Sequence, residues 1–183
     1  MVRMLVLTEV AIRARKFVSP RNLDFQLTLL LCFRLASGWG SGAVEFPYLV
    51  APIAALREAF EEDAVSLSTF PTNSIPSQDA LSDQDLCLTF INADAGEGYM
   101  THDGINGDRN DLFAQKGGDK LARFVGENCG GGKGKTVIVV HSVGPVVVEN
   151  WIDTPTVKGL LFANLPGQES GNALVSIVAL LNL

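Results

Sequence analysis

Apolar residues from residue 85 onward come in short runs, several of them β-branched, with amphipathic stretches between them. Apolar runs of about four to eight residues are typical of buried strands, and longer amphipathic stretches are typical of helices. The pattern predicts strands at Leu86–Asn92, Thr136–His141 and Val157–Ala163. It predicts helices at Asp119–Asn128 and Val146–Ile152. The closing segment Asn172–Leu181 has the composition of a helix, although its IVALL run would also serve as a strand.

Strands that alternate with helices usually form a parallel sheet with helices on both faces. We therefore predict an α/β fold, a three-layer sandwich with a mainly parallel sheet. Upstream, Val50–Glu62 has a helical pattern, and Val65–Phe70 is a weaker strand candidate. The predicted core side chains of that helix are Ala54, Leu56, Ala59 and Phe60. A polar connector, Pro71–Asp83, follows.

Residues 1–37 have no clear hydrophobic period and stay unassigned. The N-terminal apolar run before Glu9 is shorter than the core of a signal peptide, which takes about 7–15 residues. Leu27–Ala36 is more apolar but contains Arg34, and it falls short of the roughly 20 apolar residues that span a bilayer. We therefore expect neither a signal sequence nor a membrane segment.

A long polar loop, Ala93–Gly118, follows the first predicted strand and contains six glycines and five acidic residues. Loops longer than about 12–15 residues are uncommon in compact domains and are often functional. This one leaves the carboxyl end of a strand, where open α/β sheets bind ligands. The loop is therefore the first place to look for a site.

Composition narrows the classes of function. The chain has 183 residues, 47% of them apolar, which suits one globular domain. Its formal net charge of −6 argues against a nucleic-acid partner, because phosphate binding requires clustered basic residues. The three cysteines, Cys32, Cys87 and Cys129, are too few and too widely spaced for a disulfide scaffold or a zinc site. We expect them to be buried or free thiols.

Four glycine-containing motifs follow one another along the chain. They are GWGSG at 38–42 followed by FPY at 46–48, NADAGEGY at 92–99 leading to GDRN at 107–110, HSVGP at 141–145, and LPGQESGN at 165–172. In their order and spacing these motifs resemble the second, α/β-sandwich domain of family 3 glycoside hydrolases, most closely the fungal β-glucosidases. The resemblance covers about Ser37 to Val178, and it implies a truncated C-terminal domain over residues 38–183 whose sandwich is incomplete at both ends.

The resemblance implies a retaining β-glucosidase, in which one carboxylate forms a glycosyl-enzyme intermediate and a second acts as acid and base. In this family the nucleophile belongs to a preceding (β/α)8 barrel domain, whereas this domain supplies the acid/base. The matching glutamate is Glu97, and the matching sugar contact is Ser41. Position 95, commonly serine in the fungal pattern, is Ala95 here. Trp39 is a further substrate candidate that would pack either on the sugar face or at the domain interface.

Other acidic residues compete with Glu97 for this role. Glu169 precedes the last predicted helix, where an acid also suits the helix dipole. Asp108 and Arg109 suggest an ion pair that staples the long loop. Asp94 and Asp108 are the carboxylates to consider as nucleophiles if the chain proves active alone.

Some sequence features suggest nucleotide, nucleophile or metal chemistry, but each lacks a part that this chemistry requires. The run CGGGKGKT from Cys129 to Thr136 resembles a phosphate-binding loop, but it lacks the leading glycine and precedes a strand instead of following one. His141 and Ser142 are adjacent at a strand end and point to opposite faces, so they cannot form a nucleophile and base pair. His102 stands beside Asp103 without further ligands, so we predict no metal and no cofactor.

Two classes of function remain. The chain is either the acid/base part of a β-glucosidase, with a β-glucoside or cello-oligosaccharide as substrate, or a noncatalytic carbohydrate-binding or interaction domain. A complete barrel takes about 250 residues and is not encoded here. The resemblance implies a barrel-domain partner and an extracellular location. Without the barrel, the uncovered face would favour self-association.

Overall fold

The computed structural model describes residues 26–31, 35–62, 65–70, 74–102 and 104–178. Its centre is a five-stranded sheet in the order β2-β1-β3-β6-β7, and every neighbouring pair is parallel. The strands are β1 (Gln26–Leu31), β2 (Ser66–Phe70), β3 (Leu86–Ala93), β6 (Lys135–Ser142) and β7 (Val157–Phe162). The predicted α/β class and all three predicted strands of the second half are confirmed.

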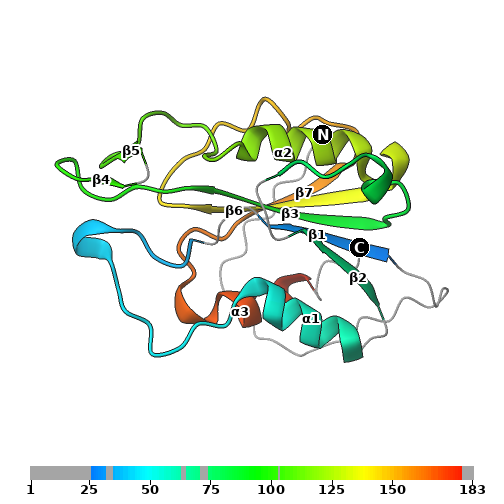
Figure 1. Cartoon of the computed structure of the whole chain (residues 1–183), viewed down its shortest axis with the longest axis horizontal. Coiled ribbons are helices and arrows are strands. Elements are labelled where there is room, and N and C mark those ends of the chain that lie inside the picture. The colour runs from blue at the N-terminus through cyan, green and yellow to red at the C-terminus, as the bar shows by residue number, and fades with distance from the viewer. Residues whose placement is uncertain (1–25, 32–34, 63–64, 71–73, 103, 179–183) are drawn as a thin grey trace.

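Helices cover both faces of this sheet. Helix α2 (Gly118–Asn128) lies on one face, and α1 (Pro52–Glu62) and α3 (Ser170–Val178) lie on the other (Figure 1). Because strand side chains alternate between faces, β3 sends Leu88 and Phe90 toward α1 and α3, and Cys87 and Ile91 toward the α2 side. All eight residues of β3 are buried. The three-layer arrangement therefore follows from strands that are apolar on both faces.

The helix predictions have mixed outcomes. Helix α2 is confirmed, and α3 shows that residues 172–178 form a helix and not a strand, with residues 179–181 outside the described part. In α1, Leu56 and Phe60 are buried as predicted and Ala59 is half-buried. The prediction for Ala54 is wrong, because it is exposed and its neighbour Ala55 is buried against α3.

The helix predicted at Val146–Ile152 is wrong. Residues 145–148 are irregular, and a turn follows in which the amides of Trp151 and Ile152 both donate to the carbonyl of Val148. The amide of Val147 donates to the carbonyl of Leu112, on the long loop. Three consecutive β-branched valines disfavour a helix. The apolar residues of the segment instead cover the core on the α2 side, around buried Trp151.

Strand β1 lies inside the segment that the hydrophobic pattern left unassigned. It pairs with β2 on one side and β3 on the other, near the middle of the sheet. Its sequence, QLTLLL, is mostly apolar, as is usual for a strand inside a parallel sheet. Cys32 follows this strand and lies outside the described residues.

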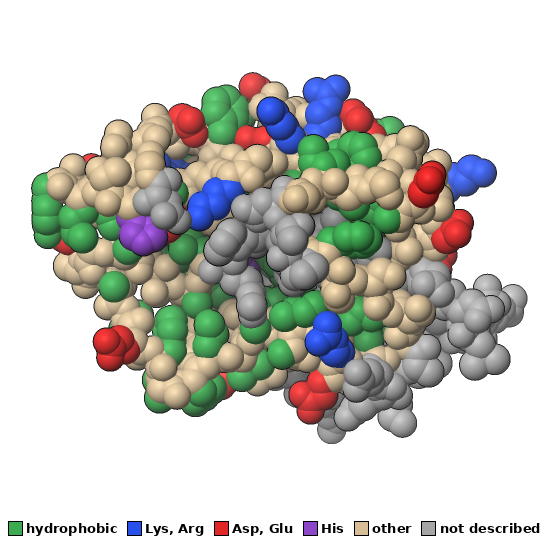
Figure 2. All heavy atoms as spheres, in the orientation of Figure 1, with side chains coloured by type: hydrophobic (Ala, Val, Ile, Leu, Met, Phe, Trp, Pro, Cys, Tyr) green, Lys and Arg blue, Asp and Glu red, His purple; other side chains and the backbone are tan. Residues whose placement is uncertain are grey.

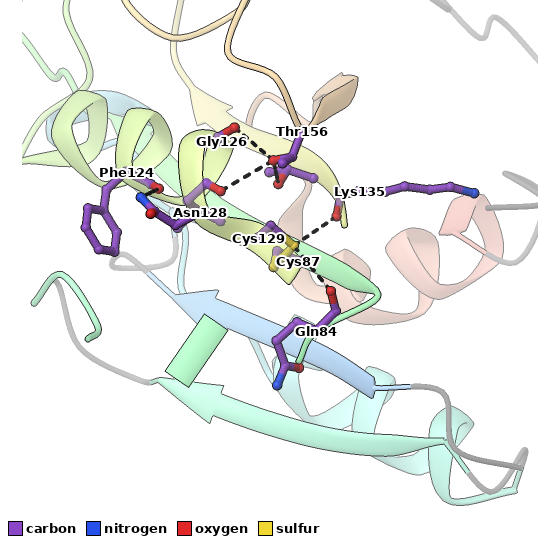
Figure 3. Close-up of a disulfide and its surroundings, with 10 residues drawn as sticks. Gln84, Cys87, Phe124, Gly126, Asn128, Cys129, Lys135 and Thr156 are labelled. Carbon is purple, nitrogen blue, oxygen red and sulfur yellow. Dashed lines mark hydrogen bonds between the residues drawn. A yellow bond between two sulfur atoms is a disulfide. The ribbon is translucent and has the colours of Figure 1, made fainter. Parts of the chain in front are cut away.

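The expectation that the cysteines are buried or free thiols is only partly right for two of them, which are buried but are not thiols. Cys87 and Cys129 form a disulfide with a Cα–Cα distance of 6.2 Å. Figure 3 shows it joining the start of β3 to the residue that ends α2. Both cysteines are fully buried beside Leu121 and Val125. The spacing of the cysteines could not reveal the pairing, because 42 residues separate them in sequence and only the packing of α2 on β3 brings them together.

Short elements complete the fold. Strands β4 (Thr101–His102) and β5 (Ile105–Asn106) form an antiparallel pair within the long loop. Single 3-10 turns occur at η1 (Gly40–Gly42), η2 (Asp79–Leu81), η3 (Cys129–Gly132) and η4 (Gly167–Glu169). Within the described ranges, no helix has the length and apolar character that crossing a membrane requires.

Candidate active site at the carboxyl end of the sheet

Two loops that are far apart in sequence meet beyond the carboxyl end of β3. One follows β3 and carries Glu97, and the other carries Ser41 on η1; both lie at the same end of the molecule in Figure 1. The Ser41 hydroxyl donates to Glu97 Oε1 at 2.7 Å, and the Ser41 amide donates to Oε2 at 2.9 Å. This direct contact places Ser41 and Glu97 on one rim of the domain.

Glycines allow these loops to approach so closely. A Cβ atom on Gly96 would lie 2.0 Å from Cε3 of the Trp39 ring, so the indole packs directly on the backbone beside Glu97. A Cβ atom on Gly107 would lie 1.8 Å from the carbonyl oxygen of Glu97. The amide of Gly96 also donates to the carbonyl of Gly107 at 2.7 Å. Side chains at either position would separate the strands of the loop that present Glu97.

The carboxylate of Glu97 is stabilised as an anion. The Ser41 hydroxyl, the Ser41 amide and the Tyr99 hydroxyl lower the pKa of Glu97, because hydrogen bonds to a carboxylate favour its charged form. The Tyr99 hydroxyl donates to Oε2 at 3.0 Å, and the pKa of Tyr99 is raised by that bond. Glu97 is therefore an accessible, ionised group with three donors directed at it.

Tyr99 as a partner of Glu97 was not singled out in the sequence. A tyrosine two residues after an acid carries no distinctive signal, and only the turn between them brings the two side chains together. In that turn the amide of Met100 donates to the carbonyl of Glu97 at 2.8 Å. The tyrosine ring is 83% exposed, so its outer face is open to a ligand or a partner domain.

Asp94 and Trp39 lie behind Glu97. Gln115 fixes the backbone of Asp94 through two 2.8 Å hydrogen bonds: the Asp94 amide donates to Gln115 Oε1, and Gln115 Nε2 donates to the Asp94 carbonyl. Burial raises the pKa of Asp94, and the Ala95 amide, His102 and Lys116 act in the opposite direction. The Trp39 ring lies 6.0 Å from the His102 ring. Contacts inside this domain therefore cover part of the Trp39 side chain.

Glu169 has different partners from Glu97. It accepts hydrogen bonds from the Tyr48 hydroxyl at 2.5 Å and from Asn172 at 2.6 Å, and both bonds lower its pKa. It ends η4 and directly precedes α3, as expected for an acid at a helix N-terminus. The same turn holds both ends of the Ser41 loop, since Gly167 donates to the Ala36 carbonyl and Val50 donates to the Gln168 carbonyl.

The predicted ion pair between Asp108 and Arg109 is wrong. The Arg109 guanidinium donates instead to the carbonyl of Pro145 at 2.9 Å, and among the described residues no ion pair joins it to Asp108. Arg109 has a positive φ of 74°. Asp108 lies beside Gly98, because a Cβ on that glycine would be 3.0 Å from Asp108 Oδ2. Arg109 thus staples the loop to the HSVGP motif.

The remaining sequence candidates have structural surroundings. Burial lowers the pKa of His141 to about 4, and its ring packs edge-on against Phe90 at 6.1 Å. The Ser142 hydroxyl donates to the Gly144 carbonyl and closes a turn. The run from Cys129 to Thr136 connects α2 to β6, and part of it, with Asp83 and Asp85, lines a hollow of 490 Å³.

Metal chemistry has no candidate in the described part of the chain. No group of three or more histidine, cysteine, aspartate or glutamate side chains is arranged there to hold a metal ion.

Comparisons with known proteins agree on one family. Residues 26–179 match the model described as "Glycosyl hydrolase family 3 C-terminal domain". The chain is 62% identical over 144 residues to "Probable beta-glucosidase E" of Aspergillus fumigatus, which covers 79% of this chain and 14% of that protein. It is 45% identical over 146 residues to "Beta-glucosidase 1" of Aspergillus aculeatus, covering 79% of this chain and 16% of that protein.

Solved structures give the same picture. A β-D-glucoside glucohydrolase from Trichoderma reesei superposes with a TM-score of 0.78 at 32% identity, over 88% of this chain and 25% of that one. A β-glucosidase from Chaetomium thermophilum superposes with a TM-score of 0.77 at 34% identity, over 91% of this chain and 22% of that one. The chain thus spans about a seventh to a quarter of the length of these relatives.

Proposed function

The chain belongs to the family of glycosyl hydrolase family 3 C-terminal domains, and from this premise we propose that it is the acid/base domain of a retaining β-glucosidase. The observation that carries the proposal is the presentation of Glu97. It stands on a glycine-flanked loop beyond the carboxyl end of β3, with Ser41 and Tyr99 bonded to its carboxylate. The relatives named above are β-glucosidases, which supports a β-glucoside or cello-oligosaccharide as substrate.

The proposed reaction requires two carboxyl groups. A carboxylate of a barrel domain attacks the anomeric carbon of the terminal glucosyl residue, while the Glu97 carboxylic acid protonates the departing oxygen. The Glu97 carboxylate then takes a proton from water, and this water attacks the anomeric carbon of the glycosyl-enzyme. The ionised Glu97 of this chain suits the second step. The first step requires a raised pKa, which burial against a barrel and substrate would favour.

Neighbouring residues have supporting roles in this proposal. Ser41 contacts a sugar hydroxyl when its own hydroxyl turns away from Glu97. Trp39 supports the loop from behind and borders the substrate. Glu169, in the turn before α3, holds Tyr48 and Asn172 and has no part in proton transfer in this proposal. Asp94 and Asp108 are likewise supporting residues.

The proposed partner is a barrel domain that covers the Glu97 end of the sandwich. That end is rich in exposed apolar side chains, namely Val44, Tyr48, Leu49, Tyr99, Met100 and Leu165. Hydrophobic surface is visible at the same end of the molecule in Figure 2. The Cys87–Cys129 disulfide supports an oxidising, extracellular location, because such bonds persist mainly in secreted proteins.

A chimaera tests this proposal. The chain would replace the matching stretch of Aspergillus fumigatus β-glucosidase E, and hydrolysis of a cello-oligosaccharide would be measured with Glu97 or with Glu97→Gln. A general acid contributes about 10²–10⁴-fold, so we expect a loss of that size in the variant. The isolated chain should have negligible turnover because it lacks the nucleophile.

Two controls sharpen the result. Glu169→Gln keeps an acceptor for the Tyr48 hydroxyl and should retain most activity. Activity of the isolated chain that Glu97→Gln abolished would contradict the division of labour, and it would require a nucleophile about 5–5.5 Å from Glu97, with Asp94 and Asp108 as candidates. A chimaera that binds sugar but shows no dependence on Glu97 would favour a noncatalytic domain.

A further inference from the structure

Two buried polar atoms behind Glu97 have no hydrogen-bond partner among the described residues of the site. They are the indole nitrogen Nε1 of Trp39 and the carboxylate oxygen Oδ1 of Asp94. Buried polar atoms are nearly always paired, so an unpaired one requires an explanation. An indole N–H can only donate and an ionised carboxylate can only accept, so the two orphaned atoms are complementary.

The two atoms belong to the two loops that form the site. Trp39 directly precedes η1, which presents Ser41, and Asp94 directly follows β3, three residues before Glu97. The indole packs on Gly96, between Asp94 and Glu97. The Trp39 side chain also acts on the Asp94 carboxyl, whose pKa it lowers against the larger effect of burial. The two groups are therefore neighbours that fall short of hydrogen-bonding geometry.

The chain contains a formed pair of the same kind. Trp151 Nε1 donates to Asp119 Oδ1 at 2.7 Å, and this pair joins the 146–152 segment to the start of α2. Burial raises the pKa of Asp119 and the bond to Trp151 lowers it, which are the same opposing influences that act on Asp94. Asp119 also accepts from the Ala114 amide at 3.1 Å. Both carboxylate oxygens of Asp119 therefore accept a hydrogen bond, whereas Oδ1 of Asp94 accepts none.

We propose that Asp94 is a positioning residue that accepts the indole N–H of Trp39 and thereby locks the Ser41 loop against the Glu97 loop. Gln115 fixes the Asp94 backbone from the α2 side through two hydrogen bonds, so the carboxylate is a stationary acceptor. The bond keeps the Trp39 ring on Gly96 and thereby holds Ser41 in reach of Glu97. The pairing rests on loop geometry alone, and its effect on turnover rests on the proposed function.

The exchange of the Trp39 indole proton in the full chain tests the pairing. The two indole N–H resonances of the described part, from Trp39 and Trp151, are assigned with Trp39→Phe and followed by NMR at neutral pH. We expect a protected Trp39 proton whose exchange becomes faster in Asp94→Ala by roughly tenfold, the factor that corresponds to one hydrogen bond. Asp94→Asn keeps an acceptor oxygen and should restore much of the protection.

A matched control separates this effect from general loosening. Asp119→Asn should change the Trp151 resonance and leave that of Trp39 unchanged. Unaltered Trp39 exchange in a folded Asp94→Ala chain would overturn the proposal, as would equal acceleration of both indole protons. Aromatic contacts of Trp39 with the Gly96 α-protons report whether the variant keeps the ring in place.

A kinetic readout tests the consequence for the reaction. In the chimaera, Asp94→Ala should lower kcat with little change in KM, and Asp94→Asn should recover most of it. Unchanged kcat in Asp94→Ala would overturn the positioning role. A chimaera without Glu97-dependent activity would overturn the proposed function, while the indole exchange would still decide whether Asp94 and Trp39 pair.

Discussion

Glu97 is bonded through both carboxylate oxygens, and this arrangement sets its protonation state. Ser41 contributes its hydroxyl and its amide, and Tyr99 adds a third donor. All three lower the pKa of an exposed carboxyl, so the free domain holds Glu97, the proposed acid/base, in the ionised form. A partner that displaced these donors or buried the carboxyl would raise the pKa toward the range that proton donation requires.

Removing the Ser41 hydroxyl should raise the pKa of Glu97. In Ser41→Ala the largest cause of the lowered pKa is lost and the amide bond remains, so the value should move part of the way to that of an ordinary glutamate. Tyr99→Phe should give a smaller rise, because the Tyr99 hydrogen bond lowers the pKa of Glu97 less than either bond from Ser41 does. The measurement is a titration of the Glu97 side-chain carboxyl carbon by NMR.

The sign of the stability effect follows from the same shift. A carboxyl with a lowered pKa in the folded state stabilises the fold above its unfolded pKa, and this contribution is lost as the pH falls through the folded pKa. Ser41→Ala should therefore weaken the dependence of unfolding on pH in the acid range. A Glu97 titration identical to that of the wild type would contradict the assigned hydrogen bonds.

The two site loops depend on a backbone contact that only glycine permits. In Gly96→Ala the new methyl group would lie 2.0 Å from the Trp39 ring, so one loop must move. We expect a loss of roughly 1–3 kcal/mol in the free energy of unfolding, the usual cost of overpacking, and a raised Glu97 pKa as the Ser41 bond is disturbed. Urea unfolding measures the first and NMR the second.

Gly42→Ala is the matched control for this prediction. It changes a glycine of the same loop pair whose Cβ would meet nothing within 4 Å. Its free energy of unfolding should stay within about 0.5 kcal/mol of the wild type. Equal losses in the two variants would mean that the close approach of Trp39 to Gly96 is not the cause.

The disulfide joins the C-terminal end of α2 covalently to β3. It closes a segment of 42 residues between the start of β3 and the end of α2. Replacing both Cys87 and Cys129 with alanine should lower the free energy of unfolding by roughly 2–4 kcal/mol, because the unfolded chain regains the freedom that the cross-link removes. Urea unfolding with and without a reducing agent checks this expectation, since the wild type should respond to reduction and the double variant should not.

Helices and strands were easier to predict from the sequence than the contacts between them. Thr136–His141 was predictable because a short, apolar, β-branched run has few alternatives, whereas the valines at 146–148 have the same composition in an irregular segment. Glu97 and Ser41 could be found through their motifs. The Tyr48–Glu169 bond spans 121 residues and depends on where the turn before α3 meets the Ser41 loop, which no local pattern encodes.

At the scale of the whole molecule, one end of the sandwich carries both the candidate site and the exposed apolar side chains. Tyr99 and Val44 are 83% and 60% exposed. Contiguous apolar patches beyond a few hundred Å² are rare on monomeric proteins and usually mark an interface. In the proposed enzyme this end faces the barrel, so the isolated chain should cover it by binding a second copy.

Sedimentation of the isolated chain over a range of concentrations tests this expectation. The mean mass should rise with concentration for the wild type and less for a Val44→Ser, Leu49→Ser variant, because serine removes apolar area from an exposed loop. An Ile75→Ser variant is the control, since Ile75 is similarly exposed on the polar connector. Monomeric behaviour of the wild type at every concentration would contradict the proposed interface.

The dependence of the Glu97→Gln defect on the leaving group tests whether Glu97 protonates the departing oxygen. In the chimaera, kcat/KM would be compared for a cello-oligosaccharide and for an aryl glucoside whose phenol is strongly acidic. A phenolate that departs without a proton does not need a general acid. We therefore expect Glu97→Gln to lower kcat/KM by about 10²–10⁴-fold for the oligosaccharide and only slightly for the activated glucoside. An equal loss with both substrates would contradict it, because Glu97 would then not be the residue that protonates the departing oxygen.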